Sequence, residues 1–452
     1  KLMFIPHTDA ERKEMLTALG LKNLNELFSD VPDKYRFPEL NMPKGMTEME
    51  AREFIEGFAD ANVTTHDYIC FLGAGAYDHY IPAAIDSILR QGEFFTAYTP
   101  YQPEISQGTL QVIFEFQSLI CNLTSLDIAN ASHYDGATAT AEACITAYAH
   151  FREKRKKIIL SGALNPQYRE VVHTYLSGID GIEIITDEEG QQSLPDPEKI
   201  IDVVDENTAI VVLQYPDFFG RIIDFTQIIN DAHQKGALVC LAVNPIALGM
   251  LKTPGEMGAD IAVGEGQPLG IPLSYGGPYL GFLAARKELV RKLSGRLVGE
   301  TVDGNGKRGY VLTLTAREQH IRREKATSNI CTNQGLIALA ATVYMSLLGK
   351  NGMQQVSNLC YQNAHYAAKK IAAVPGFEVL TPEPFFHEIM VHCPTSIEHI
   401  NHHLLNEGIL GGYPLENDYP ALRDCMLLAF TEKTTKETID LLCEVLKESH
   451  HE

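Results

Sequence analysis

The alternation of apolar and polar positions along the chain changes character near residue 125. Beyond that point, short apolar runs predict strands, several of them buried on both faces, and stretches with helical spacing separate them. Strands that alternate with helices of about 10 to 15 residues predict crossover units and therefore a mostly parallel sheet. The predicted strands are 157–160, 182–185, 209–214, 237–242 and a short one at 261, and the predicted helices are 137–155, 166–176 and 223–235.

The first hundred residues show no such alternation. Residues 8–11 and 47–50 each carry the Thr-x-x-Glu pattern of a capping box, which predicts that a helix begins there. Residues 71–80, FLGAGAYDHY, are too rich in glycine and aromatic residues for a regular helix. Residues 94–107 hold two prolines and predict an ordered loop, with a helix from Gly108 onward.

A third pattern follows residue 340 and predicts a smaller α+β domain. Its predicted strands are 377–380, 388–392 and 425–430, and its predicted helices are 396–406 and 435–447. Because 452 residues exceed what one compact core usually holds, we predict several domains. They are an N-terminal helical and loop segment over 1–100, a large α/β domain over 101–340 and a small C-terminal α+β domain over 341–452.

Composition excludes several classes of function. Asp and Glu total 58 against 37 for Lys and Arg, and the net charge of −21 argues against nucleic-acid binding. No stretch approaches the roughly 20 uninterrupted apolar residues of a membrane span, and we expect neither membrane association nor a secretory signal. Nine widely spaced cysteines without a CxxC pair are typical of reduced, buried thiols, so we expect a cytoplasmic protein.

The segments that follow the predicted strands are the first candidates for a site. In open α/β sheets, ligands bind outside the carboxyl ends of the strands. These segments are 214–220, 243–250 and 264–277, and their glycines let the backbone approach a ligand closely. None matches a dinucleotide-binding or P-loop pattern, so plain turn chemistry is the competing interpretation.

Two further groups have both a structural and a functional interpretation. The basic run at 317–331 is either a solvated helix face or an anion site that leads into hydroxyl and amide side chains. A group of histidines contains His399 and His403, which can share one helix face as metal ligands do. Without an HExxH pattern or an acidic third ligand, surface histidines are the better interpretation, and we predict no metal site. The full group is His387, His392, His399, His402 and His403.

Three strings together resemble one family. They are FTAYTPYQPEISQG at 95–108, VGEGQPLGIPLSYGGPYLGF at 263–282 and REQHIRREKATSNICTNQ at 317–334. They resemble the glycine decarboxylase P-protein of the glycine cleavage system, and more narrowly its N-terminal half, which many bacteria make as a separate first subunit. The resemblance covers nearly the whole chain. It implies a type I pyridoxal-phosphate-dependent transferase-like fold, and a complete enzyme that decarboxylates glycine and passes the aminomethyl group to the lipoyl arm of H-protein.

The resemblance also implies where the chemistry of active relatives would lie. Their Schiff-base lysine follows a histidine shortly after an Ala-Asp strand start, and here that place falls on Gln267 and Pro268. Their pyridinium carboxylate ends a strand whose counterpart ends here at Ala242. Proline has no amine and alanine no carboxylate, so both obligatory groups are absent and we predict no catalytic residue in this chain.

What the resemblance implies is therefore a cofactor-free subunit. It would pair with a second P-protein subunit that carries pyridoxal phosphate, with glycine as substrate and lipoyl H-protein as acceptor. Type I enzymes place their sites at the dimer interface, and Thr327, Ser328 and Asn329 match the loop that reaches the partner's cofactor phosphate. Residues expected near the partner's substrate channel, or alternatively in an ordered packing loop, are Tyr98, Thr99, Tyr101, Gln102 and Glu104.

Two alternatives stay open at the level of sequence. The chain could be an autonomous pyridoxal-phosphate enzyme that uses another lysine, with Lys252 and Lys325 as candidates. It could also be a non-enzymatic regulator of the same fold. Whether the altered pocket is an empty cleft or holds an effector is likewise open.

Overall fold

The computed structural model describes residues 7–186, 194–328, 330 and 334–449. These residues form two compact units, Lys1–Val63 and Thr64–Glu452. Helices α1 (Asp9–Ala18) and α2 (Glu48–Asp60) of the first unit begin where predicted. In each, the N-terminal threonine hydroxyl accepts a hydrogen bond from a backbone N–H inside the helix, and the paired glutamate completes the capping box. Neither helix buries a side chain.

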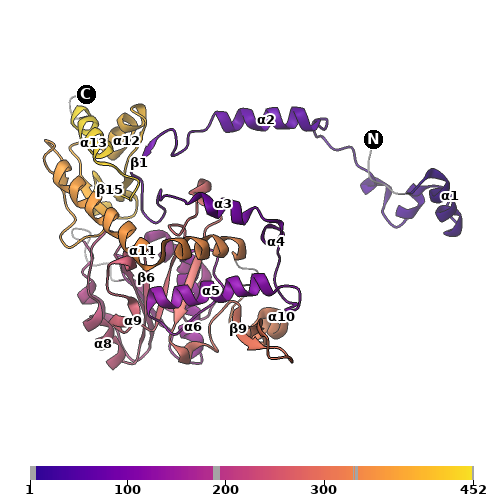
Figure 1. Ribbon diagram of the computed structural model, residues 1–452, viewed down its shortest axis with the longest axis horizontal. Helices are drawn as coiled ribbons and strands as arrows, with labels where there is room; N and C mark the ends of the chain where they lie inside the picture. The colour runs from indigo at the N-terminus through magenta and orange to yellow at the C-terminus, as the bar shows by residue number, and fades with distance from the viewer. Residues whose placement is uncertain (1–6, 187–193, 329, 331–333, 450–452) are drawn as a thin grey trace. The chain divides into compact units, whose positions relative to one another are not determined.

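The second unit is built on a seven-stranded sheet in the order β2-β8-β7-β6-β5-β3-β4 (Figure 1). Strands β3 to β7 run parallel, and β8 and β2 pair antiparallel at one edge. The mostly parallel α/β sheet predicted from the sequence is thus confirmed. Its strands are β2 (Ile128–Ala129), β3 (Lys157–Leu160), β4 (Glu183–Thr186), β5 (Thr208–Tyr215), β6 (Leu238–Val243), β7 (Ile261–Glu265) and β8 (Gly281–Ala285).

Helices cover both faces of this sheet. On β5, Val211 and Leu213 belong to one core cluster, and Ile210 and Val212 belong to another. Successive strand side chains point to opposite faces, so a strand covered on both sides is apolar throughout. The helices α5 (Gln107–Thr124), α8 (Thr226–Gln234) and α11 (Gly335–Ile371) contribute to the first cluster, and α6 (Gly136–His150) and α7 (Pro166–Leu176) contribute to the second.

The predicted helix over 137–155 ends earlier than expected, at His150. Arg152 and Glu153 have backbone φ of 54° and 63°, which lies in the left-handed region and cannot continue a right-handed helix. Sequence spacing also did not reveal β8, or the hairpin of β9 (Leu297–Val302) and β10 (Arg308–Thr313). The remaining short elements of this part are β1 (Ile69–Cys70), α3 (Ala83–Leu89), α4 (Gly92–Phe95), α9 (Pro254–Met257) and α10 (Gln319–Arg322).

A second sheet, in the order β11-β12-β15-β14, forms the C-terminal part and confirms the strands predicted there. Helices α12 and α13 pack against it, and Phe71 from the N-terminal side of the unit joins their core. The elements are β11 (Glu378–Val379), β12 (Glu388–His392), α12 (Ile397–Asn406), β13 (Ile409–Leu410), β14 (Tyr413–Pro414), β15 (Cys425–Ala429) and α13 (Lys436–Glu448).

Helix α11 links the two cores of this unit. It runs across residue 340, where the sequence predicted that the large domain ends and the small one begins. The predicted domain boundaries at residues 100 and 340 stay predictions. Among the helices of the described residues, α11 is the one whose length and composition would allow it to cross a membrane. However, 44% of its most apolar window is buried inside the structure.

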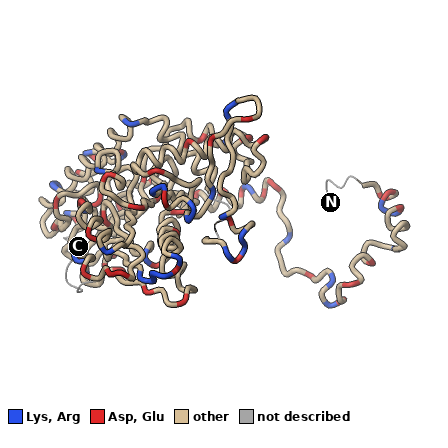
Figure 2. The backbone as a smooth tube through the Cα atoms, turned by 90° about the horizontal axis from the view of Figure 1, so that it is seen from below, with Lys and Arg blue, Asp and Glu red and all other residues tan. Residues whose placement is uncertain are grey.

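Charged residues of both signs are mixed along the chain rather than gathered in one block (Figure 2).

Candidate functional site

The carboxyl ends of β5, β6 and β7 surround a small cavity of about 40 Å³. The three segments that follow these strands therefore meet, as the sheet topology predicts. Ala242 and Pro268, the two positions where the family's carboxylate and lysine were expected, both line this cavity. The other lining residues are Gly75, Tyr77, Asn165, Tyr168, Gln214, Val243, Asn244, Pro245 and Glu265.

Glu265, the last residue of β7, supplies a buried carboxyl group at this edge. Its Oε2 accepts a hydrogen bond from the backbone N of Gly136 at 3.0 Å. Its Oε1 accepts from the backbone N atoms of Gln267 at 3.0 Å and Leu280 at 3.1 Å. Since Gly136 is the first residue of α6, the carboxyl group takes the place where a helix N-terminus binds an anion.

Burial raises the pKa of Glu265 to about 8, against the lowering effect of the three N–H donors. The residues around the start of α6 are closely packed. A Cβ atom on Gly136 would lie 2.1 Å from the Tyr168 hydroxyl, so only glycine allows α6 to begin so close to Tyr168. The chain's own groups thus occupy the helix terminus.

Residues 73–77 close the same cavity from the other side. The side chain of Gln267 binds the backbone of Tyr77 twice, accepting from its N at 2.9 Å and donating to its O at 2.8 Å. Ala74 is held in the same way: its O accepts from Asn165 Nδ2 at 2.9 Å, and its N donates to Glu388 Oε1 at 2.7 Å. This segment lies in the irregular stretch predicted at 71–80, and it acts here as a plug.

Glu388 connects the plug to the C-terminal sheet. It begins β12, and its Oε2 accepts a hydrogen bond from the Tyr77 hydroxyl at 2.8 Å. Burial raises its pKa to about 7. The neighbouring His387 packs its ring against Tyr77, with centroids 4.6 Å apart, and burial lowers its pKa to about 3. The interpretation of His387 as a surface histidine is therefore wrong, because its place beside Tyr77 is interior.

The predicted crossing loop turns toward its own chain at Ser328. Its hydroxyl donates to Glu142 Oε1 of α6 at 2.7 Å and accepts from the backbone N of Ile330 at 3.1 Å. Burial raises the pKa of Glu142 to about 7. Thr327 is half-buried beside it, and Asn329 lies outside the described residues.

The predicted channel residues lie away from the 40 Å³ cavity. Tyr98 and Thr99 line a second cavity of about 220 Å³ together with the residues that begin α11. Tyr98 is 75% exposed, and Tyr101 accepts a hydrogen bond from Arg296 Nη2 at 2.9 Å. Gln102 and Glu104 are exposed. The structure thus brings Tyr98 and Thr99 next to residues 334–336, close in sequence to the crossing loop.

Neither alternative lysine reaches the 40 Å³ cavity. The Lys252 ammonium donates to Thr226 Oγ1 at 2.7 Å and pairs with Asp224 at 3.1 Å. Lys325 is exposed. The sequence had pointed to the strand ends and, through the resemblance, to Gln267, but it did not single out Glu265, Tyr77 or Glu388. The one available signal was a glutamate ending an apolar strand, next to a glycine- and tyrosine-rich segment.

Comparison with known proteins gives a consistent result. Residues 2–446 match the family described as glycine cleavage system P-protein. A protein of Desulforamulus reducens named probable glycine dehydrogenase (decarboxylating) subunit 1 is 54% identical over 98% of both chains. A protein of the same name from Thermomicrobium roseum is 51% identical over 99% of this chain and all of its own.

Solved structures agree with these matches. An inhibitor-bound glycine decarboxylase (P-protein) of the glycine cleavage system superposes with a TM-score of 0.90 at 41% identity, over 99% of this chain and 100% of that one. Glutamate decarboxylase of Lactobacillus brevis superposes with a TM-score of 0.70 at 12% identity, over 95% and 98% of the two chains, and shows likeness of fold alone. The predicted type I fold is confirmed.

Pyridoxal phosphate, the cofactor that this fold implies, does not fit the cavity of this chain. Pro268 and Ala242 offer no amine and no carboxylate there. The cavity of about 40 Å³ is far below the roughly 300 Å³ or more of a small-molecule site. The Glu265 carboxyl group and the Tyr77 segment fill the positions at the helix terminus and over the strand ends.

The raised pKa of Glu265 predicts a specific pH dependence of stability. Its folded pKa of about 8 exceeds its ordinary value of 4.5, so the folded state retains a proton that the unfolded state has lost. This contribution is fully present below pH 4.5 and is lost as pH rises toward 8, at up to about 1.4 kcal/mol per pH unit. Between pH 4.5 and 8, the free energy of unfolding in urea should therefore fall less steeply with pH for the Glu265→Gln variant than for the unaltered chain. The two slopes should differ by up to about 1.4 kcal/mol per pH unit.

A matched control is Glu256→Gln. Glu256 is exposed, and hydrogen bonds from Thr253 lower its pKa, so its loss should leave the slope between pH 4.5 and 8 unchanged. Parallel curves for the Glu265→Gln variant and the unaltered chain would show that Glu265 has no raised pKa.

Proposed function

The chain belongs to the glycine cleavage system P-protein family, and we propose that it is the cofactor-free first subunit of glycine dehydrogenase (decarboxylating). It pairs with a second P-protein subunit of similar fold, which carries pyridoxal phosphate. The complete enzyme decarboxylates glycine and passes the aminomethyl group to lipoyl H-protein. The observation that carries this proposal is the self-filled edge of the sheet, where Pro268 and Ala242 meet Glu265 and Tyr77.

The assignment of the cofactor to the partner follows from chemistry. Pyridoxal-phosphate enzymes anchor the cofactor through a lysine Schiff base and pair its ring nitrogen with a charged side chain, which tunes the ring as an electron sink. Lys252 is engaged with Asp224 and Thr226, outside the cavity. An autonomous enzyme would need an amine at the strand ends, and the lining of the cavity offers none.

The contribution of this chain is then a surface that completes the partner's site. The 220 Å³ cavity joins Tyr98 and Thr99 to the start of α11, and Phe95, Tyr98 and Ile105 of the same chain segment are exposed. Exposed aromatic and aliphatic side chains grouped in this way favour contact with another protein. We assign Tyr98, Thr99, Tyr101, Gln102 and Glu104 to the approach to the partner's substrate.

The state of the thiols supports a proposal for the location. The described cysteines are free and mostly buried, and they are spread over both cores of the second unit. Such usage supports a reducing compartment, and we place the protein in the cytoplasm.

Reconstitution tests the function directly. The purified chain with added pyridoxal phosphate should show no imine absorbance and no glycine–bicarbonate exchange. Addition of a second subunit from the same family should produce both. A borohydride-fixable imine on this chain alone would overturn the proposal, as would full exchange by the second subunit without it.

The crossing loop has its own test in the reconstituted pair. Thr327→Ala combined with Ser328→Ala should weaken pyridoxal-phosphate affinity by at least about tenfold, because the loss of even one hydrogen bond to a charged phosphate costs about 1.5 to 3 kcal/mol. Thr174→Ala with Ser177→Ala is the matched control, since these hydroxyls bond only to carbonyls of α7 in the structure. Unchanged affinity and turnover would remove Thr327 and Ser328 from the site.

A further inference from the structure

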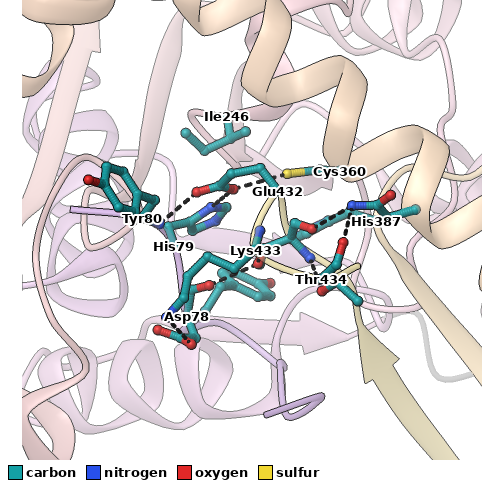
Figure 3. Close-up of polar contacts among 12 residues, drawn as sticks. Asp78, His79, Tyr80, Ile246, Cys360, His387, Glu432, Lys433 and Thr434 are labelled. Carbon is teal, nitrogen blue, oxygen red and sulfur yellow. Dashed lines mark hydrogen bonds and ion pairs between the residues drawn. The ribbon is translucent and has the colours of Figure 1, made fainter. Parts of the chain in front are cut away.

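Three side chains with the chemistry of zinc ligands converge inside the second unit, next to the plug segment and outside the lining of the 40 Å³ cavity. They are His79, Cys360 and Glu432, and their ligand atoms all lie within 4.8 Å of one another. His79 follows the plug segment, Cys360 lies in the middle of α11, and Glu432 follows β15 (Figure 3). We propose that these residues bind a zinc ion, independently of the function proposed above.

The carboxylate of Glu432 is the centre of the group. Its Oε2 lies 2.7 Å from His79 Nδ1 and 3.6 Å from Cys360 Sγ, and its Oε1 accepts from the backbone N of Tyr80 at 2.6 Å. Cys360 is fully buried and His79 is 4% exposed. The other ring nitrogen of His79, Nε2, is buried with no hydrogen-bond partner in the described structure. The ion would bind at Nδ1, the ring nitrogen that faces Glu432.

The distances are near those that a tetrahedral ion needs. Zn²⁺ bonds of about 2.0 to 2.3 Å place neighbouring ligand atoms roughly 3.3 to 3.6 Å apart. The sulfur–oxygen distance of 3.6 Å already meets this value, and the nitrogen–oxygen distance of 2.7 Å must open by about 0.6 Å. Opening this contact exchanges the hydrogen bond between His79 and Glu432 for bonds to the ion, and a water molecule would complete the fourth position.

The chemistry of the three ligand groups determines which metal ion they favour. A thiolate, an imidazole and one carboxylate suit Zn²⁺, whereas Mg²⁺ and Ca²⁺ require several oxygen ligands. Binding releases the thiol proton of Cys360, and bonds to the ion replace the contacts that Glu432 makes with His79 and Cys360. The nearest cation, Lys433, is paired with Asp78 at 2.5 Å, and its charge is therefore balanced at the edge of the site.

The position of the site gives the ion a role. His79 lies two residues after Tyr77, which closes the cavity at the strand ends, and Glu432 lies three residues after the end of β15. Zinc at this point would join the plug segment, the long helix α11 and the C-terminal sheet. It would hold the plug closed and stabilise the contact between the two cores.

The test uses the full chain without a histidine tag, treated with chelator and then given zinc alone. We expect one retained zinc per chain after desalting, measured by mass spectrometry. Cobalt(II) in its place should produce a near-ultraviolet sulfur-to-metal charge-transfer band, which requires a thiolate ligand. Cys360→Ser should abolish the band, and Glu432→Gln and His79→Gln should each weaken zinc binding by about tenfold or more.

Two controls make the result specific. Cys443→Ser removes another buried thiol, in α13, and His399→Gln removes one member of the helical histidine pair; neither should change zinc retention. Absence of zinc retention and of the cobalt band in the unaltered chain would overturn the proposal. So would retention that survives Cys360→Ser or that depends on His399. The cobalt spectrum of the unaltered chain decides the question even if a variant fails to fold.

Discussion

The buried carboxyl group of Glu265 is the constraint around which the strand ends of this protein are organised. A carboxyl group removed from water must find hydrogen-bond partners, or its burial costs several kcal/mol. Glu265 finds three, from the start of α6 and from the segment after β7. These bonds fix the first turn of α6 against β7. One of them also takes up the backbone N–H of Gly136 at the start of α6, where a helix N-terminus can bind an anion.

The plug follows from the same need. Ala242 in β6 and Pro268 after β7 offer no polar side chain to the groups that are buried here. The chain supplies the balance itself through Gln267 and Glu388, which bind the backbone and hydroxyl of Tyr77. This edge of the sheet is closed here, and the loop that contains Tyr98 is exposed. Such an arrangement suits a subunit that completes a neighbour's site.

Much of this could be predicted from the sequence. The continuous apolar runs at β3, β5 and β6 and the capping boxes at α1 and α2 are local signals, and the structure has them where they were expected. The positions of Ala242 and Pro268 came from resemblance, and the structure places both in one cavity.

The partners of Tyr77 could not be predicted, because Gln267 and Glu388 lie far away in the chain and only tertiary packing joins them. The same holds for His79, Cys360 and Glu432. His387 was misjudged for this reason, since its histidine-rich neighbourhood indicates a surface while its contact with Tyr77 is interior.

We infer that two features exclude the cofactor from this chain. One is the absence of a lysine and a carboxylate, and the more important one is that the chain's own residues fill the site. The most direct measurement is therefore a pyridoxal-phosphate titration of the combined Ala242→Asp and Pro268→Lys variant, with folding verified by circular dichroism and the unaltered chain as the baseline. The account predicts no imine absorbance above that baseline, because Glu265 and Tyr77 still fill the site. A stoichiometric, borohydride-fixable imine on the variant would contradict it.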